Sequence, residues 1–554
     1  MSNTSHYHDL IIVGSGGGSM CAALYAASRG KKVLVLEKSG YYGGTTARSG
    51  GVMWIPNNRF MKRDGVEDSF ERARTYLEAL AETFEDAPGA TPERRERFLK
   101  EAPAMIDFLV EQGLELDRVP FWPDYNDELS GGCKTSRCVV AAPFNKKALG
   151  EWADKLRPGF LDLPATLDEA LAIPYVKRSW AARKVFVRVA FKVIGALLTG
   201  KRYVSCGAAL QARLLQAALS HGVEIRLETA VRELLENNGR VTGVIAEHNG
   251  KREQLGASLG VIVGAGGFAH NQALRNQYQP GTNVQWSSAP VEDTGDMHLE
   301  LQRIGAALAQ MEEMVGQPCI LPPDSQYGEI QQSAQGPSAK PHAILVDQSG
   351  QRYLNEASSY MTYCQEMLAR NRTVPAAPSW MVFDSQYLKK YMLAGTMPGK
   401  KKLAEWEQSG FLKKGETVET LAEVINVEAT VLAQTVSRFN GFVDQNRDDD
   451  FHRGEREYAR WLGDYLHQPS PTLGRIDQGP FYAVAVYPGD VGTYGGVVTD
   501  ECARVLRDDG SVIEGLYAAG VVTASVMGRA YPGAGSSVGP ALTFGFVAAK
   551  EALA

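Results

Sequence analysis

The segment Leu10–Glu37 carries glycines and an acid at the spacing that binds a dinucleotide. It consists of an apolar stretch, a glycine-rich turn, an alanine-rich stretch and a second apolar run that ends in an acid. Gly14 and Gly16 allow a tight turn and a close approach of the backbone to a pyrophosphate, whose charge would lie at the N-terminus of the following helix. Glu37 lies where an acid accepts the ribose hydroxyls. We therefore expect a dinucleotide-binding βαβ unit at the start of the chain.

One position of this turn departs from the usual G-x-G-x-x-G spacing. Ser19 replaces the third glycine, but Gly17 and Gly18 make the turn richer in glycine than the pattern requires. Because serine is small, the helix can still pack closely on the strand. We expect the residues of this unit to contact the cofactor, namely Gly14, Gly16, Gly17, Gly18, Ser19, Glu37 and the adjacent Lys38.

A second cluster of glycines and hydroxyl residues follows where a nicotinamide enzyme would have its next crossover helix. Small residues and hydroxyls suit a flat ring that lies against the backbone. With the C-terminal strand and turn LYAAG, the arrangement is typical of a flavin enzyme. The cluster comprises Gly43, Gly44, Thr45, Thr46, Ser49, Gly50 and Gly51, and we expect further cofactor contacts at Val231, Gly264, Ala265, Gly266, Gly267, Ala519, Gly520, Ser536, Ser537 and Val538.

Three motifs rich in tyrosine stand outside the glycine turns. They are FWPDY at Phe121–Tyr125, RYLNEASSY at Arg352–Tyr360 and YPGAG at Tyr531–Gly535. With both ends of the chain, they resemble the flavoprotein family that contains fumarate reductases and 3-ketosteroid dehydrogenases, and the 3-ketosteroid Δ1-dehydrogenases in particular. The resemblance implies FAD as the cofactor and a 3-ketosteroid as the substrate.

Desaturation next to a ketone needs a polarised carbonyl, a base at the α-carbon and a hydride acceptor at the β-carbon. The Tyr531 hydroxyl and the Gly535 backbone N–H could both donate to the ketone oxygen and stabilise the developing enolate. The resemblance then makes Tyr360 the base, Tyr125 its hydrogen-bond partner and flavin N5 the hydride acceptor. A free phenol has a pKa of about 10, so Tyr360 needs help from its surroundings, and the sequence does not identify the helper.

The activity that these residues lead us to expect is FAD-dependent introduction of the C1–C2 double bond into the A ring, with electrons passed to a quinone or similar acceptor. Three alternatives stay open. Two share the flavin: a 3-ketosteroid Δ4-(5α)-dehydrogenase, and a fumarate-reductase-like enzyme that reduces an activated alkene. The third is a membrane-associated flavin-binding protein without turnover.

The composition sets limits on the class of protein. A chain of 554 residues with 44 % hydrophobic composition can bury a large core in two domains, or in one with a large insertion. A net charge of −6 disfavours nucleic acid as a partner. Seven cysteines without a C-x-x-C pair, and nine histidines without metal spacing, predict reduced thiols, Cys133 and Cys138 included, and no metal. The chain has no signal-peptide pattern and no apolar run of about eighteen residues, so we expect a cytoplasmic protein.

The elements that must position these residues follow from periodicity. Helices are predicted at 70–80, 92–113, 207–222 and 538–554, and a β-meander at 232–255 with turns at Asn238-Gly239 and Asn249-Gly250. No long helix with an acidic strand follows Gly264, so we expect its strand to return to the first sheet. The fold class is α/β: a Rossmann-like FAD-binding domain, residues 1–280 and 480–554, interrupted by an inserted α+β substrate domain, residues 281–479.

Residues 170–205 form a basic and apolar segment. No acidic residue occurs between Glu169 and Glu224, while lysines and arginines alternate there with large apolar residues. A basic amphipathic helix on an anionic membrane surface has this composition, and a helix packed on the body or a dimer contact is the alternative. With the membrane alternative, the protein would lie on the inner face of the cell membrane.

Overall fold

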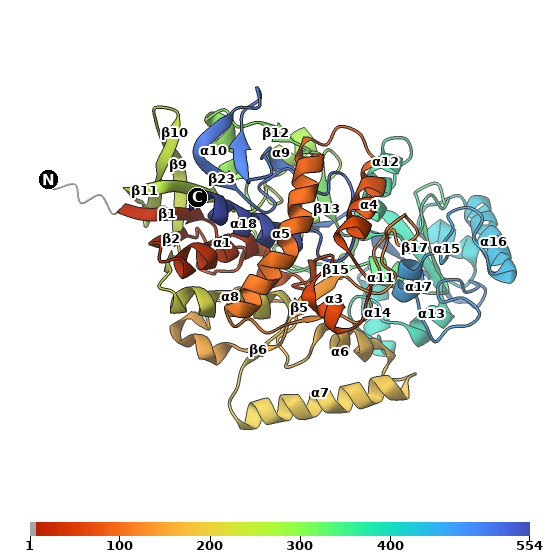
Figure 1. Cartoon of the computed structure of the whole chain (residues 1–554). Helices are drawn as coiled ribbons and strands as arrows, with labels where there is room; N and C mark the ends of the chain where they lie inside the picture. The colour runs from red at the N-terminus through yellow and green to blue at the C-terminus, as the bar shows by residue number, and fades with distance from the viewer. Residues whose placement is uncertain (1–6) are drawn as a thin grey trace.

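The computed structural model describes residues 7–554 and is built around an eight-stranded sheet (Figure 1). The strand order is β22-β23-β10-β11-β1-β2-β8, and β9 pairs with β10. The strands are β1 Tyr7–Val13, β2 Val33–Leu36, β8 Glu224–Arg226, β9 Thr229–Asn237, β10 Arg240–His248, β11 Lys251–Val263, β22 Arg504–Leu506 and β23 Val512–Ala518.

The middle of this sheet is parallel, as a Rossmann-like fold requires. Strand β1 pairs in parallel with β2 and β11, and β11 pairs in parallel with β23. Because successive side chains point to opposite faces, Leu10 and Ile12 enter one hydrophobic core while Ile11 and Val13 enter another. Strand β11 returns beside β1, as expected from the turn at Gly264.

Helices α1 Gly17–Ser28, α8 Cys206–Ser220 and α18 Val538–Ala552 cover one face of the sheet. Helices α1 and α18 pack closely, since a Cβ atom added at Gly545 would lie 2.1 Å from the Gly18 carbonyl oxygen. The first and last helices of the fold therefore meet backbone to backbone beside the dinucleotide turn.

The local predictions for helices and turns are confirmed. Helices α4 Phe70–Ala81 and α5 Pro92–Glu111 begin at the expected positions, where the Ser69 and Thr91 hydroxyls cap them by accepting backbone N–H groups. The antiparallel meander turns at Asn238-Gly239 and Asn249-Gly250, and all four turn residues have positive φ.

The central part of the chain builds a second, four-stranded sheet. Its order is β16-β17-β19-β18, with helices packed on it to form two further cores. At its edges the structure differs from the predicted domain limits: Phe481–Val486 (β19) belongs to this second sheet, because it pairs with β17, and Asp296–Arg303 (α10) packs on the first. The strands are β16 Ala343–Val346, β17 Ser379–Asp384, β18 Lys413–Gly415 and β19 Phe481–Val486.

The remaining elements are short or peripheral. The other helices are α2 Gly44–Arg48, α3 Arg59–Arg63, α6 Leu167–Ala172, α7 Trp180–Leu198, α9 Gln272–Tyr278, α11 Gln335–Ser338, α12 Tyr360–Asn371, α13 Ser385–Lys390, α14 Lys400–Gln408, α15 Val418–Val424, α16 Ala429–Gln445 and α17 Glu457–Leu462, with 3-10 turns η1 Pro88–Ala90, η2 Lys146–Trp152, η3 Ile173–Tyr175 and η4 Val284–Trp286. The other strands are β3 Met53–Trp54, β4 Leu116–Arg118, β5 Cys138–Ala141, β6 Phe144–Asn145, β7 Tyr203–Val204, β12 Leu308–Ala309, β13 Met314–Gly316, β14 Cys319–Ile320, β15 Gln332–Ser333, β20 Asp490–Thr493 and β21 Gly496–Val497.

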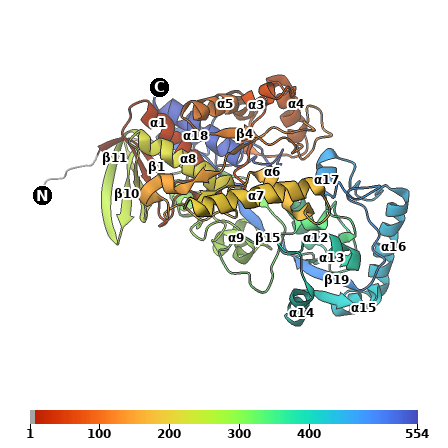
Figure 2. The ribbon, with the colours of Figure 1, turned by 90° about the horizontal axis from the view of Figure 1, so that it is seen from below.

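Helix α7, within the basic and apolar segment, is the outermost element of the fold. It lies below the body in Figure 1 and in front of it when seen from below (Figure 2). Its buried residues, Ala182, Val189 and Ala196, recur every two turns and form a single inward stripe. Glu169 of α6 anchors the helix through Arg188 and Lys192, at 2.9 Å each. Across residues 7–554, no helix combines the length and hydropathy needed to cross a membrane.

Candidate active site

The predicted dinucleotide turn has the conformation that its glycines allow. Gly14 has φ +91°, and a Cβ atom there would lie 2.5 Å from the Gly264 carbonyl oxygen. Gly16 precedes α1 and has no side chain to cap it. The Ser19 hydroxyl donates to that same Gly264 carbonyl at 3.3 Å, so serine fits the contact usually made by glycine. The turn therefore presents bare backbone at the N-terminus of α1, as a pyrophosphate site requires.

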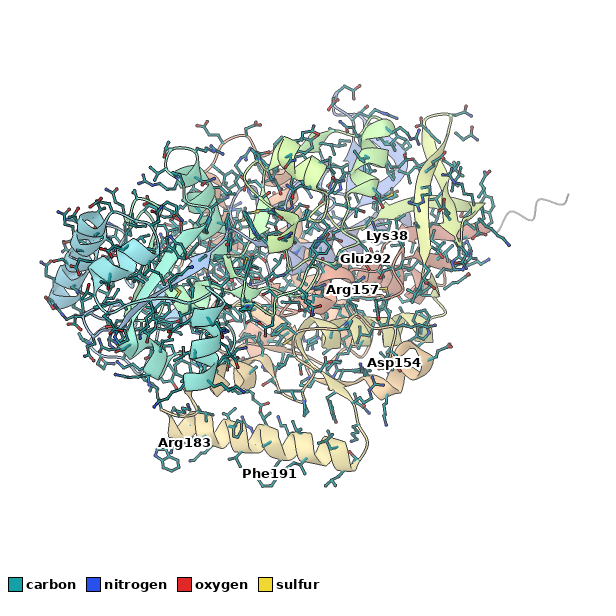
Figure 3. All side chains as sticks on the ribbon, turned by 180° about the vertical axis from the view of Figure 1, so that it is seen from behind. Lys38, Asp154, Arg157, Arg183, Phe191 and Glu292 are labelled. Atoms are coloured by element: carbon teal, nitrogen blue, oxygen red, sulfur yellow. The ribbon has the colours of Figure 1, made fainter. Side chains whose placement is uncertain are left out.

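Glu37 is buried at the end of β2, where its carboxylate is already oriented. It accepts hydrogen bonds from the Ser15 N–H at 3.1 Å, the Ser15 hydroxyl at 2.6 Å and the Ser39 N–H at 2.9 Å. Lys38 instead donates to Asp296 at 2.9 Å on α10. Figure 3 shows Lys38 close to Arg157 and Glu292, which pair at 3.2 Å. Both residues of the predicted acid-lysine pair thus lie beside the glycine turn.

The second glycine cluster lies next to the first. The Ser15 hydroxyl accepts the Gly43 N–H at 3.0 Å, and the Thr46 hydroxyl accepts the Gly17 N–H at 3.1 Å. Gly51 has φ +64°, and a Cβ atom there would lie 2.5 Å from a backbone nitrogen of α8. The other predicted members follow this path: Gly44 and Thr45 open α2, and Ser49 and Gly50 end it.

The remaining predicted cofactor residues come from three strands and α18. Val231 lies on β9, Gly264, Ala265, Gly266 and Gly267 follow β11, Ala519 and Gly520 follow β23, and Ser536, Ser537 and Val538 lead into α18. All these segments meet at the carboxyl end of the parallel strands, where ligands bind in this class of sheet, and β9 begins there because the Thr229 N–H donates to the Glu37 carbonyl at 2.9 Å.

Asp293 is a buried acid beside this region that the sequence did not point out. Its carboxylate accepts the Thr45 hydroxyl at 3.3 Å, and a Cβ atom at Gly266 would lie 2.5 Å from it. Burial raises the pKa of Asp293 to about 7, while Lys38 acts in the opposite direction. This carboxyl group therefore changes charge near neutral pH.

A cavity at the start of α18 contains a second residue that the sequence did not reveal. Gly520, Ser536 and Ser537 line it together with Arg94. Arg94 is 2 % exposed and donates to the carbonyl oxygen of Ala524 at 2.9 Å, while its Nε finds no hydrogen-bond partner among residues 7–554. Burial lowers the pKa of Arg94 to about 10, so the guanidinium stays charged near neutral pH. A buried cation thus lies at the predicted cofactor site.

The three predicted catalytic tyrosines come together. The ring centroids of Tyr125 and Tyr360 are 5.4 Å apart, those of Tyr360 and Tyr531 are 5.0 Å apart, and those of Tyr125 and Tyr531 are 5.9 Å apart. They come from the loop after β4, the first residue of α12 and the loop before α18. Segments that lie far apart in the chain thus place three phenols in one cluster.

Hydrogen bonds fix the loops that carry Tyr125 and Tyr531. The Tyr125 N–H donates to the Pro532 carbonyl at 2.9 Å, and the Tyr76 hydroxyl donates to the same oxygen at 2.7 Å. The Asp124 carboxylate, next to Tyr125, accepts from Trp54 at 2.8 Å and pairs with Arg137 at 2.6 Å. These contacts hold FWPDY against YPGAG.

Gly535 has a conformation and surroundings that exclude any side chain. Its φ is +89°, and a Cβ atom would lie 2.2 Å from the Val52 carbonyl oxygen. Within residues 7–554 its N–H makes no backbone hydrogen bond, while its carbonyl accepts from Trp54 and Gly539. The Tyr531 hydroxyl lies 3.0 Å from that of Ser537. A backbone donor and a phenol donor therefore share one turn.

Burial disfavours ionisation of all three phenols. It raises the pKa of Tyr360 well above its ordinary value, and the neighbouring Tyr125 and Tyr531 raise it further. The rings of both neighbours lie within 5.4 Å of the Tyr360 ring, measured between centroids. Burial is also the main cause of the raised pKa of Tyr125 and Tyr531, and the Tyr360 hydroxyl partly offsets it in both. Two further phenols thus stand beside that of Tyr360.

Two more tyrosines border the cluster. The Tyr458 ring centroid of α17 lies 4.3 Å from that of Tyr125, closer than either predicted partner. Tyr494 lies 5.9 Å from Tyr531 by the same measure and donates to the Ser536 carbonyl at 3.3 Å. Tyr458 stands in a charged stretch with no motif, so no signal in the sequence indicated it. No group of three metal-ligating side chains was found among residues 7–554.

Comparison with known proteins identifies the family. A family model described as an FAD binding domain matches residues 9–538. The 3-oxosteroid 1-dehydrogenase of Mycolicibacterium smegmatis is 37 % identical over 564 residues, covering 99 % of this chain and 97 % of that protein. The chain belongs to this FAD-binding family. FAD is accordingly its cofactor, and the glycine turns fit that assignment.

Two further members of the family help to define it. A crystal structure of the 3-ketosteroid delta1-dehydrogenase from Sterolibacterium denitrificans, in complex with 1,4-androstadiene-3,17-dione, has a TM-score of 0.91, 35 % identity and 99 % coverage of both chains. The 4-oxocyclohexanecarboxylate 2-dehydrogenase of Sinomonas cyclohexanicum is 33 % identical over 560 residues, with 98 % and 92 % coverage. Members of the family are thus named for the dehydrogenation of ring ketones.

Proposed function

We propose that this protein is an FAD-dependent 3-ketosteroid dehydrogenase that introduces a double bond between C1 and C2 of the A ring. The observation that carries the proposal is the cluster of Tyr125, Tyr360 and Tyr531 beside the free N–H of Gly535. The names of the relatives in M. smegmatis and S. denitrificans support the same reaction.

In this mechanism the ketone oxygen of the substrate accepts from the Tyr531 hydroxyl and the Gly535 N–H. The two donors polarise the carbonyl and stabilise the enolate that forms when the C2 proton leaves. Tyr360 takes that proton on its phenol oxygen as its own hydroxyl proton passes to Tyr125, and Tyr125 in turn releases its hydroxyl proton towards solvent. The glycine turns and the start of α18 hold FAD, which supplies the hydride acceptor for C1.

Proton transfer through the cluster answers the question that the high pKa of Tyr360 raises. An ionised Tyr360 is disfavoured by burial, so a concerted relay, in which Tyr360 gains the C2 proton while its own proton moves through Tyr125 to solvent, costs less free energy than a free phenolate would. The two donors at the ketone oxygen stabilise the enolate and so lower the pKa of the C2 proton. The difference between that pKa and the pKa of the accepting phenol becomes smaller.

The other reactions make different demands. A Δ4-(5α)-dehydrogenase would remove hydrogen at C4 and C5, and an alkene reductase would run electrons towards the substrate. In a flavin-binding protein without turnover, removal of the Tyr360 hydroxyl would change no measurable activity. The relative that is named for 4-oxocyclohexanecarboxylate suggests a further compound to test, a ring ketone with a carboxylate.

The experiment is anaerobic mixing of the FAD-loaded protein with a 4-ene-3-ketosteroid, followed by flavin absorbance and by product mass and proton spectra. Bleaching with loss of hydrogen at C1 and C2 supports the proposal. Loss at C4 and C5 from a 5α-steroid indicates the Δ4 reaction, and bleaching only by 4-oxocyclohexanecarboxylate indicates the smaller substrate. Oxidation of the reduced flavin by an unsaturated acid, without steroid turnover, indicates the reductase. If none of these compounds changes the flavin absorbance, the result supports a flavin-binding protein without turnover.

A quinone is the proposed electron acceptor, because a steroid and a quinone both partition into membranes. The test compares reoxidation of the steroid-reduced protein by a soluble quinone and by oxygen. Faster reoxidation by the quinone supports it, and equal or slower reoxidation contradicts it.

We also propose that α7 rests on the inner face of the cell membrane. Its outward residues share one face, opposite the buried stripe, with Arg183 and Lys184 along its edges. Figure 3 shows Arg183 and Phe191 on this outermost helix. The positive charge, with no acid among residues 170–223, suits anionic lipid better than a two-fold dimer contact, which would bring two basic faces together. The outward apolar residues are Trp180, Val187, Phe191, Ile194 and Leu198.

Flotation of the FAD-loaded protein with vesicles tests this surface. Binding to vesicles of mixed neutral and anionic phospholipid, with weaker binding to purely neutral vesicles, supports it. Equal recovery without vesicles contradicts it, and concentration-dependent self-association without lipid binding indicates a dimer contact.

A further inference from the structure

One glutamine side chain connects the supports of two different active-site tyrosines. The amide nitrogen of Gln335 donates to the Ser358 carbonyl at 2.9 Å and to the Tyr458 hydroxyl oxygen at 2.9 Å. Gln335 is the first residue of α11 and is 7 % exposed. A carbonyl oxygen can only accept, so the nitrogen end of the amide must face Ser358, and the orientation of the group is unambiguous.

The first contact supports Tyr360. Ser358 lies two residues before it, and Ser359 caps α12, where its hydroxyl accepts the Thr362 N–H at 3.2 Å. The bond from Gln335 therefore fixes the backbone at the point where the chain enters α12. Because Tyr360 is the first residue of that helix, a shift of this entry moves its phenol directly.

The second contact supports Tyr125. The Tyr458 ring lies 4.3 Å from the Tyr125 ring, and the Tyr458 N–H donates to Asp127 at 3.0 Å in the same loop. Since the Tyr458 oxygen accepts from the amide, the position of the Tyr458 ring is fixed at its hydroxyl end, and this ring packs directly on that of Tyr125.

The glutamine itself is firmly held. The Ser338 hydroxyl donates to the backbone carbonyl of Gln335 at 3.1 Å, and Arg453 donates to the Ser338 carbonyl at 3.1 Å. Arg453 is fully buried and pairs with Glu356 at 3.2 Å, in the same motif that ends at Tyr360. The amide thus connects two tyrosine loops from a rigid base.

We propose that Gln335 is a positioning residue that sets the separation of the Tyr360 and Tyr125 hydroxyls. The inference rests on the proposed function, because that separation matters for proton abstraction. Substrate binding through Tyr531 and Gly535 does not involve the glutamine. Its loss should therefore lower kcat and leave KM nearly unchanged.

The test compares Gln335→Met and Gln335→Glu with Gln331→Met in the FAD-loaded protein. Gln331 is the matched control, since it is 6 % exposed and its amide donates to two carbonyls of its own loop. Methionine keeps the volume without polar atoms, and glutamate keeps the shape while it removes both donors. Readouts are kcat, KM, the isotope effect with a C2-deuterated steroid, and hydrogen exchange of residues 352–362.

We expect both Gln335 variants to lose roughly tenfold to a hundredfold in kcat, as for a misplacement of about 1 Å, with KM within threefold. The C2 isotope effect should rise because proton abstraction becomes more limiting, and exchange of 352–362 should quicken. The control should change none of these. Wild-type kcat and exchange in Gln335→Met, or loss in the methionine variant alone, would overturn the inference. If the wild type desaturates no ketosteroid, the proposed function fails, and hydrogen exchange alone decides whether Gln335 orders the Tyr360 loop.

Discussion

Replacement of Phe191 by serine should weaken vesicle binding by tenfold or more. Phe191 is 69 % exposed on the outward stripe of α7. A phenylalanine buries roughly 200 Å², so about 140 Å² is available to insert, and at about 25 cal/mol per Å² this is worth about 3.5 kcal/mol. Half that insertion, about 1.7 kcal/mol, already exceeds the roughly 1.4 kcal/mol that corresponds to tenfold in affinity.

The assay is flotation of the FAD-loaded protein with anionic vesicles over a range of lipid concentrations. Leu299→Ser is the matched control, because Leu299 is 51 % exposed on α10, away from α7. Added salt should weaken binding of the wild type and of Phe191→Ser alike, since Arg183 and Lys184 act through screened charge. Wild-type binding by Phe191→Ser would refute insertion of this face, and an equal loss in Leu299→Ser would mean that the effect is not specific to α7.

Three further outcomes are expected. Tyr360→Phe should retain FAD and lose roughly a hundredfold to ten-thousandfold in the rate of flavin bleaching by steroid, measured by stopped flow. Arg94→Met should make the reduction potential of bound FAD more negative, because a buried cation favours the electron-rich reduced flavin. The change in the free energy of reduction should be on the order of 1 kcal/mol, measured by redox titration, and the control Arg95→Met should show no change. Asp293 has a folded pKa raised to about 7, so the folded state holds an extra proton between pH ~4 and ~7 and stability falls as pH rises through that window. Denaturation of the FAD-free protein should therefore find Asp293→Asn more stable than wild type at pH 8 and equal to it at pH 4; the same difference at both would contradict this.

The parts of the fold that the sequence predicted are those governed by local rules. Gly14 and Glu37 bracket a strand, a turn and a helix within one short stretch, and the hydrophobic period of residues 70–80 needs no distant partner. The meander turns have Asn-Gly pairs that adopt positive φ on their own account. Such features form from short stretches of sequence and do not depend on packing against distant parts of the chain.

The site depends on long-range packing, so the grouping of its side chains could not be predicted from the residues alone. Tyr125, Tyr360 and Tyr531 could be grouped only through family resemblance, because no spacing brings them together. Tyr458 has no motif, although it lies closest to Tyr125.

Arg94 shows the same limit for a charge. It stands among other arginines in PERRERF, and nothing in that pattern reveals that this one is buried against Ala524. The edges of the inserted domain were displaced for a related reason, since Phe481–Val486 takes its place by pairing with β17.

The close crossing of α1 and α18 has a consequence for biosynthesis. Strand β11 lacks its neighbour β23, and α1 lacks the helix that covers Gly18, until residues 512–552 have been synthesised. The nascent chain therefore carries an unpaired sheet edge and an uncovered apolar helix through nearly all of translation, the condition in which chains aggregate or recruit chaperones. The predicted FAD site, to which Ser536, Ser537 and Val538 at the start of α18 contribute, is therefore complete only after this late closure.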